Sequence, residues 1–313
     1  MNLGRRRKQT FGDPVDGILL LDKPAGITSN EALQRAKKLL AARKAGHTGS
    51  LDPIATGLLP LCFGSSTRWS GYFLGSDKYY MATVRLGETT ETGDSEGAVT
   101  KRVSVNVTES QVRSILQEFL GTRLQVPPMY SAIKMDGQPL YKLARQGKEI
   151  EREAREVTVH ELDFQSYNGR DVELTLRCSS GFYVRTLATE FGERLETGAH
   201  VIELRRLGVA GLLLDQALTL DDLEKMTGPV ERRTHLGAVG EALDHLPAVE
   251  LSVDAAFYLC RGKSVRAANL PGEGSVRLYS SAAGFLGVGV VGPHGTVAPE
   301  RLVPTGTQTG RIC

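Results

Sequence analysis

Hydrophobic and polar residues follow strand-like patterns in five stretches of the chain. In each stretch, either a short apolar run has the length of a buried strand, or apolar and polar residues alternate as in a strand with one buried face. These stretches are residues 17–21, 78–86, 156–165, 171–178 and 201–204. Asn168-Gly169, between two of them, is a dipeptide typical of a tight hairpin.

Three further segments have apolar residues at helical spacing. Two of them begin with a capping box, in which a side chain and a backbone N–H at the start of a helix satisfy each other. The boxes are Thr28 with Glu31 and Thr108 with Gln111. The predicted helices continue through Leu40 and Leu120, with Gly121 expected as the C-cap of the second. The third amphipathic stretch covers residues 182–195.

Glycine and proline are concentrated between Gly46 and Pro60, where three glycines and two prolines occur in fifteen residues. Glycine permits unusual backbone angles and proline removes a backbone donor, so we predict a shaped loop rather than a helix or a central strand. Asp52 stands in this loop, before Pro53. Two interpretations stay open: Asp52 presents a reactive carboxylate, or it caps a short helix that begins at Pro53.

The chain divides into parts of different character. Residues 1–13 form a basic arm that we expect to be flexible. Residues 14–247 contain most of the predicted elements, interrupted by an irregular basic insertion at 126–152. A boundary is expected near 228–247, where turn-rich sequence begins. Residues 248–313 combine short strands with one small helix, which predicts a separate β-rich domain.

Composition is that of a globular protein, with 41% apolar and 24% charged residues among 313. Four widely spaced cysteines without a C-x-x-C pair argue against a zinc site or a disulfide scaffold. No apolar run reaches the length of a membrane span, and no apolar core follows the basic N-terminus as in a secretory signal. We therefore expect a cytoplasmic protein without a membrane partner.

Positive charge is clustered in two segments, although the net charge is only +2. The first predicted helix and the residues after it carry Arg35, Lys37, Lys38, Arg43 and Lys44. The segment 123–155 carries Lys134, Lys142, Arg145, Lys148, Arg152 and Arg155, interleaved with Tyr130 and Tyr141. Basic residues with aromatics between them are typical of a nucleic-acid surface. The alternatives are a solvated helix face and a mobile surface insertion.

Five motifs, in order along the chain, give it a resemblance to a known family. They are LDKPAG at 21–26, GHTGSLDPIATG at 46–57, SDKYY at 76–80, PMYSA at 128–132 and SSGFYVR at 179–185. The sequence resembles the TruB family of bacterial tRNA pseudouridine synthases over essentially its whole length. The resemblance implies an α+β pseudouridine synthase fold: a mixed, mainly antiparallel sheet with flanking helices, an inserted thumb loop and a C-terminal PUA-like RNA-binding domain.

The resemblance also implies a reaction, the isomerisation of uridine 55 in the T loop of tRNA. Uracil is detached at N1, rotated and rejoined through C5, which is redox-neutral and requires neither cofactor nor metal. Asp52 matches the family's catalytic carboxylate, and a carboxylate can act as a nucleophile. Whether it attacks C6 of the base, attacks C1′ of the sugar or assists elimination through a glycal stays open. Arg185 matches an arginine that favours the ionised carboxylate.

Five other positions receive roles from the family, and a structural alternative exists for Tyr80, Leu204, His47 and Lys23. Tyr80 would stack on the target base and act in proton transfer, whereas strand tyrosines more often pack in a core. Leu204 would form an apolar wall of the uracil pocket. His47 would fill the space left by the flipped base, and Lys23 and Tyr183 would contribute to substrate binding. A hydrogen-bonding loop histidine and a structural Lys-Pro turn are the alternatives for His47 and Lys23.

The implied partner is the T stem-loop of tRNA, bound by a monomer without a guide RNA, and a tRNA-folding role is expected in addition. One rival is an RNA-binding or RNA-folding protein without catalysis, which the presence of Asp52, Tyr80 and Arg185 disfavours. Another is a guide-dependent pseudouridine synthase, disfavoured by the long basic insertion. A hydrolase in which Asp52 activates water lacks a second positioned carboxylate or a metal cluster.

Overall fold

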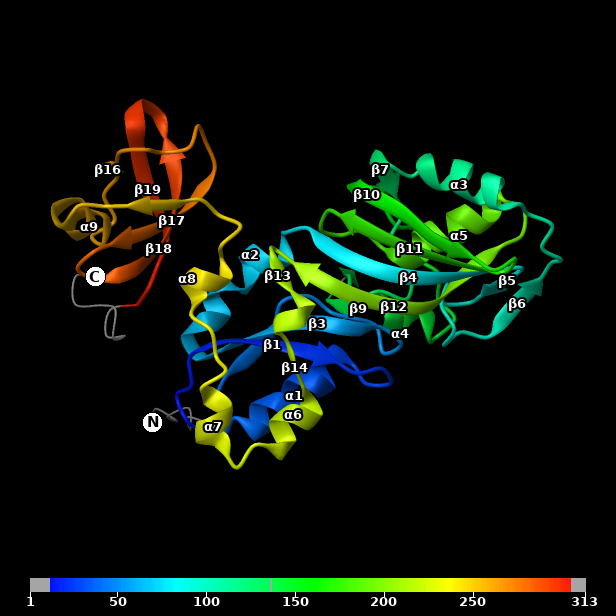
Figure 1. Ribbon diagram of the computed structural model, residues 1–313, viewed down its shortest axis with the longest axis horizontal. Coiled ribbons are helices and arrows are strands. Elements are labelled where there is room, and N and C mark those ends of the chain that lie inside the picture. The colour runs from blue at the N-terminus through cyan, green and yellow to red at the C-terminus, as the bar shows by residue number, and fades with distance from the viewer. Residues whose placement is uncertain (1–11, 136, 305–313) are drawn as a thin grey trace, which may run out of the picture. The chain divides into compact units, whose positions relative to one another are not determined.

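The computed structural model describes residues 12–135 and 137–304. The chain forms two compact units, each described by itself below (Figure 1). The larger unit holds Leu19–His235 with the residues up to Val15, and the smaller one holds Asp16–Ile18 and the chain from Leu236 onward. The basic arm predicted over residues 1–13 lies outside the described residues, apart from its last two. Among the residues described, no helix is long and apolar enough to cross a membrane.

A ten-stranded sheet forms the framework of the larger unit. Its main path is β14 (Leu218–Thr219), β1 (Gly17–Lys23), β3 (Thr56–Phe63), β12 (Ala199–Val209), β4 (Lys78–Leu86), β11 (Asp171–Cys178), β10 (Arg155–Tyr167) and β7 (Gly121–Gln125). β13 (Leu212–Leu213) pairs with β12, and β2 (Ala45–His47) with β3. β1 and β14, and β3 and β12, run parallel, whereas β4 is antiparallel to β12 and β11, and β10 to β11 and β7. The mixed, mainly antiparallel sheet is therefore confirmed.

Helices and smaller elements flank this sheet (Figure 1). They are α1 (Ser29–Leu39), α2 (Ser70–Leu74), α3 (Glu109–Gln117), α5 (Val184–Arg194), α6 (Leu220–Lys225) and α7 (Pro229–Arg233), the 3-10 helices η1 (Gly64–Trp69) and η2 (Leu214–Gln216), and the hairpin of β5 (Glu88–Thr90) and β6 (Val99–Arg102). Phe119, just after α3, packs edge-on against Phe191 of α5 with ring centroids 6.3 Å apart. This contact joins two helices over the sheet.

Both predicted capping boxes are confirmed. At the start of α1, the Glu31 N–H donates to Thr28 Oγ1 at 3.1 Å, and the Thr28 N–H donates to Glu31 Oε2 at 2.7 Å. The box before α3 has the same two bonds. The prediction of Gly121 as the C-cap is wrong, because α3 ends at Gln117 and Glu118 is its C-cap. Gly121 instead opens β7, where its φ of +89° turns the chain into the strand.

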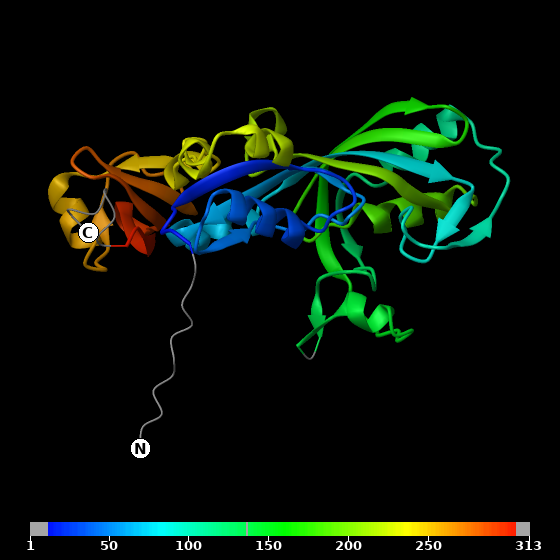
Figure 2. The same ribbon diagram turned by 90° about the horizontal axis from the view of Figure 1, so that it is seen from below.

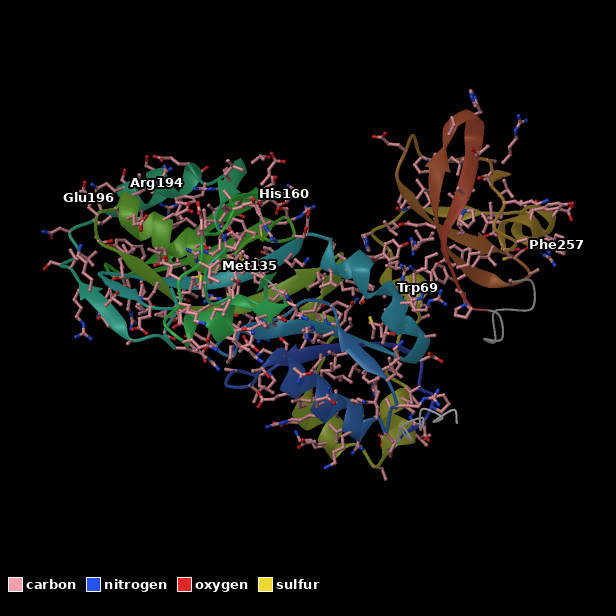
Figure 3. All side chains as sticks on the ribbon, turned by 180° about the vertical axis from the view of Figure 1, so that it is seen from behind. Trp69, Met135, His160, Arg194, Glu196 and Phe257 are labelled. Atoms are coloured by element: carbon pink, nitrogen blue, oxygen red, sulfur yellow. The ribbon has the colours of Figure 1, made fainter. Side chains whose placement is uncertain are left out.

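The basic insertion contains short elements that the sequence did not predict. These are β8 (Lys134–Met135), β9 (Gln138–Pro139) and α4 (Leu140–Ala144). Residues 126–130 have no regular structure, as their prolines indicated. In Figure 2 the insertion projects from the sheet of its own unit, and Met135 is labelled in Figure 3. Its basic residues Lys134, Lys142, Arg145 and Lys148 are exposed.

The prediction of one loop from Gly46 to Pro60 is wrong at both ends, because β2 extends to His47 and β3 begins at Thr56. Gly57 is required inside this strand, where its φ is +101° and a Cβ atom would lie 2.3 Å from the carbonyl oxygen of Arg206. Pro60 needs no backbone donor there, and its carbonyl accepts hydrogen bonds from both the N–H and the hydroxyl of Thr48. No helix begins at Pro53, so the structure does not support Asp52 as a helix cap.

Gly57→Ala is expected to lower the free energy of unfolding by roughly 3 kcal/mol or more, because it combines a positive φ with a collision against β12. Gly169→Ala is the matched control: Gly169 has a φ of +94°, but a Cβ atom there would meet nothing within 4 Å beyond its chain neighbours. The control should cost only about 1 kcal/mol. Thermal unfolding of both variants would check this, and equal losses would contradict the crowding argument.

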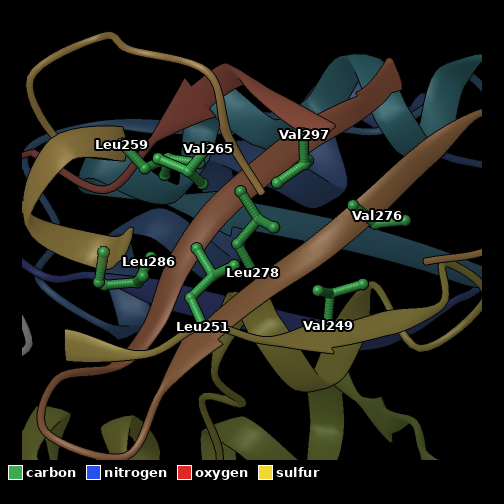
Figure 4. Close-up of a cluster of buried hydrophobic side chains, with 9 residues drawn as sticks. Val249, Leu251, Leu259, Val265, Val276, Leu278, Leu286 and Val297 are labelled. Carbon is green, nitrogen blue, oxygen red and sulfur yellow. The ribbon is translucent and has the colours of Figure 1, made fainter. Parts of the chain in front are cut away.

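The smaller unit has a five-stranded sheet in the order β15 (Ala248–Glu250), β17 (Ser275–Ser280), β18 (Gly284–Gly292), β19 (Thr296–Leu302) and β16 (Val265–Arg266). Two helices, α8 (Val239–Ala242) and α9 (Val253–Leu259), belong to the same unit. Its core is apolar, with Leu251, Leu259, Val276 and Leu278 among the buried side chains (Figure 4). A β-rich second unit is thus confirmed.

Candidate active site

The loop that carries Asp52 is held on both sides of that residue. Before it, the Leu51 N–H donates to Ser29 Oγ at 2.7 Å, and the Ser29 hydroxyl is 3.1 Å from the Leu51 carbonyl. After it, the Gly26 N–H donates to the Pro53 carbonyl at 2.8 Å. The first turn of α1 and the turn after β1 therefore fix the backbone around the carboxylate, and a fixed backbone is what a reactive group requires.

Arg185, in the first turn of α5, forms an ion pair with this carboxylate. Its Nε lies 3.0 Å from Asp52 Oδ2, and its side chain is only 5% exposed, compared with 38% for Asp52. The other guanidinium nitrogens donate to the carbonyls of Thr92 at 2.8 Å and Tyr130 at 2.6 Å. Arg185 thus joins three separate loops, and its fork geometry fixes the orientation of the carboxylate.

Asp94 is a second carboxylate at this arginine, which sequence reasoning missed. Its Oδ2 lies 3.4 Å from Arg185 Nη1, and its side chain is 3% exposed. Its Oδ1 accepts hydrogen bonds from the Thr92 hydroxyl and from the Glu96 N–H at 3.1 Å. By composition, residues 87–97 indicate only a polar, acidic loop. The available signal was Thr92-Gly93-Asp94, a turn-forming composition that cannot reveal a distant arginine.

The Asp52 carboxyl is subject to opposing electrostatic effects. Burial raises its pKa above the usual value, and the Arg185 guanidinium acts in the opposite direction. Asp94 adds to the rise, and the Lys23 ammonium opposes it. The net direction is upward, so ionisation of Asp52 depends on its cationic neighbours.

A cavity of about 400 Å³ opens beside this pair. One wall is a face of the sheet, where β4 and β12 place Tyr80 opposite Arg206 and Ala82 opposite Leu204. The predicted site residues that line the cavity are Asp52, Tyr80, Tyr183, Arg185 and Leu204. Burial raises the pKa of the Tyr80 and Tyr183 phenols above the usual value. The cavity is within the size range of sites for small ligands, and a single base is a small ligand.

Lys23 and His47 are not among the residues that line this cavity. The Lys23 ammonium donates to the carbonyls of Pro24 at 2.8 Å, Ile27 at 2.7 Å and Pro53 at 3.4 Å, and burial lowers its pKa to about 8. These contacts favour a role in holding the Asp52 loop. His47 Nδ1 is buried without a hydrogen-bond partner in the described part of the chain. Their assignment to substrate binding stays a prediction.

Within residues 12–135 and 137–304 there is no group of three or more His, Cys, Asp or Glu side chains that could hold a metal ion. The arrangement consists of a carboxylate with its guanidinium partner, a tyrosine and an apolar wall around a small cavity. Such a set can carry out nucleophilic or acid–base chemistry on a flat ring bound between Tyr80 and Leu204.

Comparison with known proteins decides the family. Models of the TruB pseudouridylate synthase N-terminal domain, the tRNA pseudouridylate synthase B C-terminal domain and the pseudouridine synthase II TruB C-terminal region match residues 37–184, 185–249 and 247–303. The tRNA pseudouridine synthase B of Methylobacillus flagellatus is 48% identical over 92% of this chain and 95% of its own. That of Yersinia enterocolitica is 45% identical over 96% and 94%. The chain belongs to the TruB family.

Solved structures agree on the fold of this TruB-family chain. A Cbf5–Nop10–Gar1 complex contains a chain with a TM-score of 0.72 and 24% identity, covering 96% of this chain and 92% of that one. A chain of an archaeal box H/ACA Nop10–Cbf5 complex gives 0.68 and 22%, covering 96% and 93%. These similarities confirm the pseudouridine synthase fold predicted from the motifs.

Proposed function

We propose that this TruB-family enzyme isomerises uridine 55 in the T loop of tRNA to pseudouridine, as a cytoplasmic monomer without a guide RNA. The observation that carries the proposal is the 3.0 Å pair of Asp52 and Arg185, which faces a cavity of about 400 Å³. Relatives of similar length that share about half of their residues with this chain bear the name tRNA pseudouridine synthase B.

In this proposal Asp52 is the catalytic carboxylate. The reaction breaks the bond between C1′ and N1 of uracil and forms one between C1′ and C5, and the proton lost from C5 is balanced by one gained at N1. Attack at C6, attack at C1′ and assisted elimination to a glycal all use an ionised carboxylate. Arg185 supports each route equally, because its Nε holds one carboxylate oxygen of a residue that lines the cavity. The choice among the three routes is not part of the proposal.

Tyr80 and Leu204 would hold the uracil ring. They project from neighbouring strands on one face of the sheet, next to Asp52 across the cavity. A ring bound there could stack on the Tyr80 side chain and contact Leu204, while the phenol hydroxyl relays the proton that leaves C5, giving up its own proton as it receives that one. Stacking on an aromatic side chain contributes about 1–3 kcal/mol per base, which would offset part of the cost of extruding the base from the T loop.

The basic segments would bind the RNA backbone. Arg35, Lys38, Arg43 and Lys44 are exposed on and just after α1, which is anchored to the Asp52 loop through Ser29. The exposed lysines and Arg145 of the insertion follow Tyr130, whose carbonyl binds Arg185. Phosphate contacts from such residues position an RNA without reading its sequence. In this proposal they bring the T stem-loop to the cavity.

The test is to incubate the purified chain alone with an unmodified tRNA transcript and to map pseudouridine by position. Product at uridine 55, and none in a transcript with cytidine at that position, is the expected result. Product at other positions would overturn the assigned target. If product forms only after a guide RNA or protein partners are added, the guide-dependent alternative would replace the proposal, and binding without any product would favour the non-catalytic one.

A further inference from the structure

Arg206 is a buried cation at the cavity, and none of the roles proposed for the site residues involves it. It is 1% exposed and is the largest of the fully buried side chains. None of the ion pairs formed within the described part of the chain includes it, whereas its neighbour Arg205 pairs with Asp22 at 2.6 Å. A buried charge is costly unless polar groups satisfy it, and an apolar residue of similar size is often more stabilising. Stability therefore does not explain why a guanidinium occupies this position.

The guanidinium is directed at the backbone around the catalytic loop. Its Nε donates to the Leu58 carbonyl at 2.7 Å, and its Nη2 donates to the Gly49 carbonyl at 3.2 Å. Gly49 precedes Asp52 by three residues on the same loop, and a Cβ atom at Gly49 would lie 3.7 Å from Arg206 Nη1. Arg206 therefore holds the N-terminal side of the Asp52 loop against the sheet.

The same side chain contacts Tyr80. Arg206 of β12 and Tyr80 of β4 are directly opposite each other in an antiparallel pairing, so their side chains lie on the same face of the sheet. Both residues line the cavity, and the Arg206 charge acts on the Tyr80 phenol. One guanidinium thus holds the loop of the carboxylate and lies on the same face of the sheet as the aromatic ring.

We propose that Arg206 is a positioning residue that holds the Tyr80 phenol at a fixed place relative to the Asp52 loop, and that it affects the reaction through Tyr80. This inference rests on the proposed function, because it assumes that Tyr80 and Asp52 act on one base. The guanidinium carries further N–H donors, and one directed at the phenol oxygen would fix the position of the Tyr80 ring. A phenol held in this way keeps its separation from the carboxylate when a base enters between them.

The electrostatics of the site agree with this arrangement. Burial raises the pKa of the Tyr80 phenol, and the Arg206 charge opposes that rise. Arg206 also contributes to the lowered pKa of Lys78, about 8, although burial is the larger cause. The Lys78 ammonium donates hydrogen bonds to the carbonyls of Phe73, Leu74 and Ser76, so its donors are directed at the backbone and not at the Tyr80 phenol.

The test is a double-mutant cycle of Arg206→Gln and Tyr80→Phe, read as the single-turnover rate of pseudouridine formation and as tRNA affinity. Arg206→Gln is expected to lower the rate about 10- to 100-fold, the size of a lost charge-assisted hydrogen bond. Its tRNA affinity should change by less than about threefold, because a side chain that is 1% exposed offers little surface to the RNA. In the Tyr80→Phe background the further loss of rate should be under about fivefold.

Two further measurements keep the test decisive. Arg206→Lys retains the charge and should recover part of the rate, whereas Arg205→Lys, the neighbouring control outside the cavity, should leave the rate within about twofold. Thermal unfolding of the same cycle requires no activity, and the losses in Tm of the two single variants should be less than additive in the double one. If the Tyr80→Phe rate is too low to compare, this Tm cycle decides.

The outcomes separate the inference from the proposed function. An active wild type with independent effects of the two substitutions would overturn the role of Arg206 and leave the proposed function intact. A large loss of tRNA affinity in Arg206→Gln would also overturn it, because Arg206 would then serve RNA binding. A wild type that forms no pseudouridine on tRNA would overturn the proposed function and this inference with it.

Discussion

Asp52→Asn should lower the single-turnover rate of pseudouridine formation by at least about 10³-fold while tRNA affinity changes by less than about threefold. The substitution keeps the shape of the side chain and removes its charge, so no route that uses a carboxylate can proceed. The backbone of the loop is held by Ser29, Gly26 and Lys23 and does not depend on the carboxylate. Rate and affinity are therefore expected to separate.

Asp163→Asn provides the control, because Asp163 is an exposed aspartate of β10 outside the cavity. It should leave both rate and affinity unchanged. Turnover by Asp52→Asn within about tenfold of the wild type would show that the carboxylate is dispensable, and the chemistry would have to be assigned to another group. Loss of affinity together with rate would instead indicate that Asp52 has a role in RNA binding. A retained ability to refold tRNA without turnover would separate catalysis from the tRNA-folding role that the family resemblance implies.

Arg185→Met is expected to lower the rate at neutral pH by about 10²- to 10⁴-fold and to move the acidic limb of the pH–rate profile to higher pH. Burial already raises the pKa of Asp52, and Arg185 opposes that rise. Without the guanidinium the pKa rises further, so the carboxylate is ionised only above a higher pH. Activity should therefore recover in part as the pH is increased, and rates measured from about pH 5 to about pH 9 would reveal it.

The same substitution leaves Asp94 buried without a cation, which costs roughly 3–5 kcal/mol for a broken buried pair and can lower Tm strongly. Adding Asp94→Asn removes the second carboxylate and should restore part of the lost Tm but not the lost rate. Arg194→Met is the matched control at the exposed end of α5 (Figure 3), where Arg194 contacts Glu118. An unchanged acidic limb in Arg185→Met would contradict the electrostatic role of Arg185.

Most of the fold could be predicted because its signals are local. The capping boxes at Thr28 and Thr108 and the alternation in β4, β10 and β11 depend only on neighbouring residues. The start of β3 could not be predicted from neighbouring residues. Gly57 is required there because a Cβ atom would collide with the backbone of Arg206, which is distant in sequence. β19 has a weak local signal for a similar reason: it contains Pro299 and charged residues, and its pairing with β18 and β16 makes it a strand.

Some residues of the candidate site could be predicted from the sequence, and others could not. Asp52, Tyr80, Tyr183 and Arg185 lie in motifs that carry the family resemblance, and Leu204 lies in a predicted strand. The structure brings all five together at one cavity. Asp94 and Arg206 lie in none of the motifs that can be recognised in the sequence. Asp94 belongs to the site because it pairs with Arg185 of α5, and Arg206 belongs to it because of the register of β12 against β4. Sequence patterns identify groups that chemistry requires, but they do not identify the groups that orient them.

The hydrogen bond from Arg185 to the Tyr130 carbonyl determines which part of the insertion an engineer could exchange. Tyr130 belongs to the scaffold of the carboxylate, and Ala132 and Ile133 still line the cavity. Among the residues that the structure describes, the outer portion, from the β8–β9 hairpin through Lys148, makes no such hydrogen bond to the scaffold of Asp52. Grafts that retarget the enzyme to other RNA stem-loops should therefore join after Ile133. Such grafts exchange the outer part of the insertion and keep the residues that support Asp52.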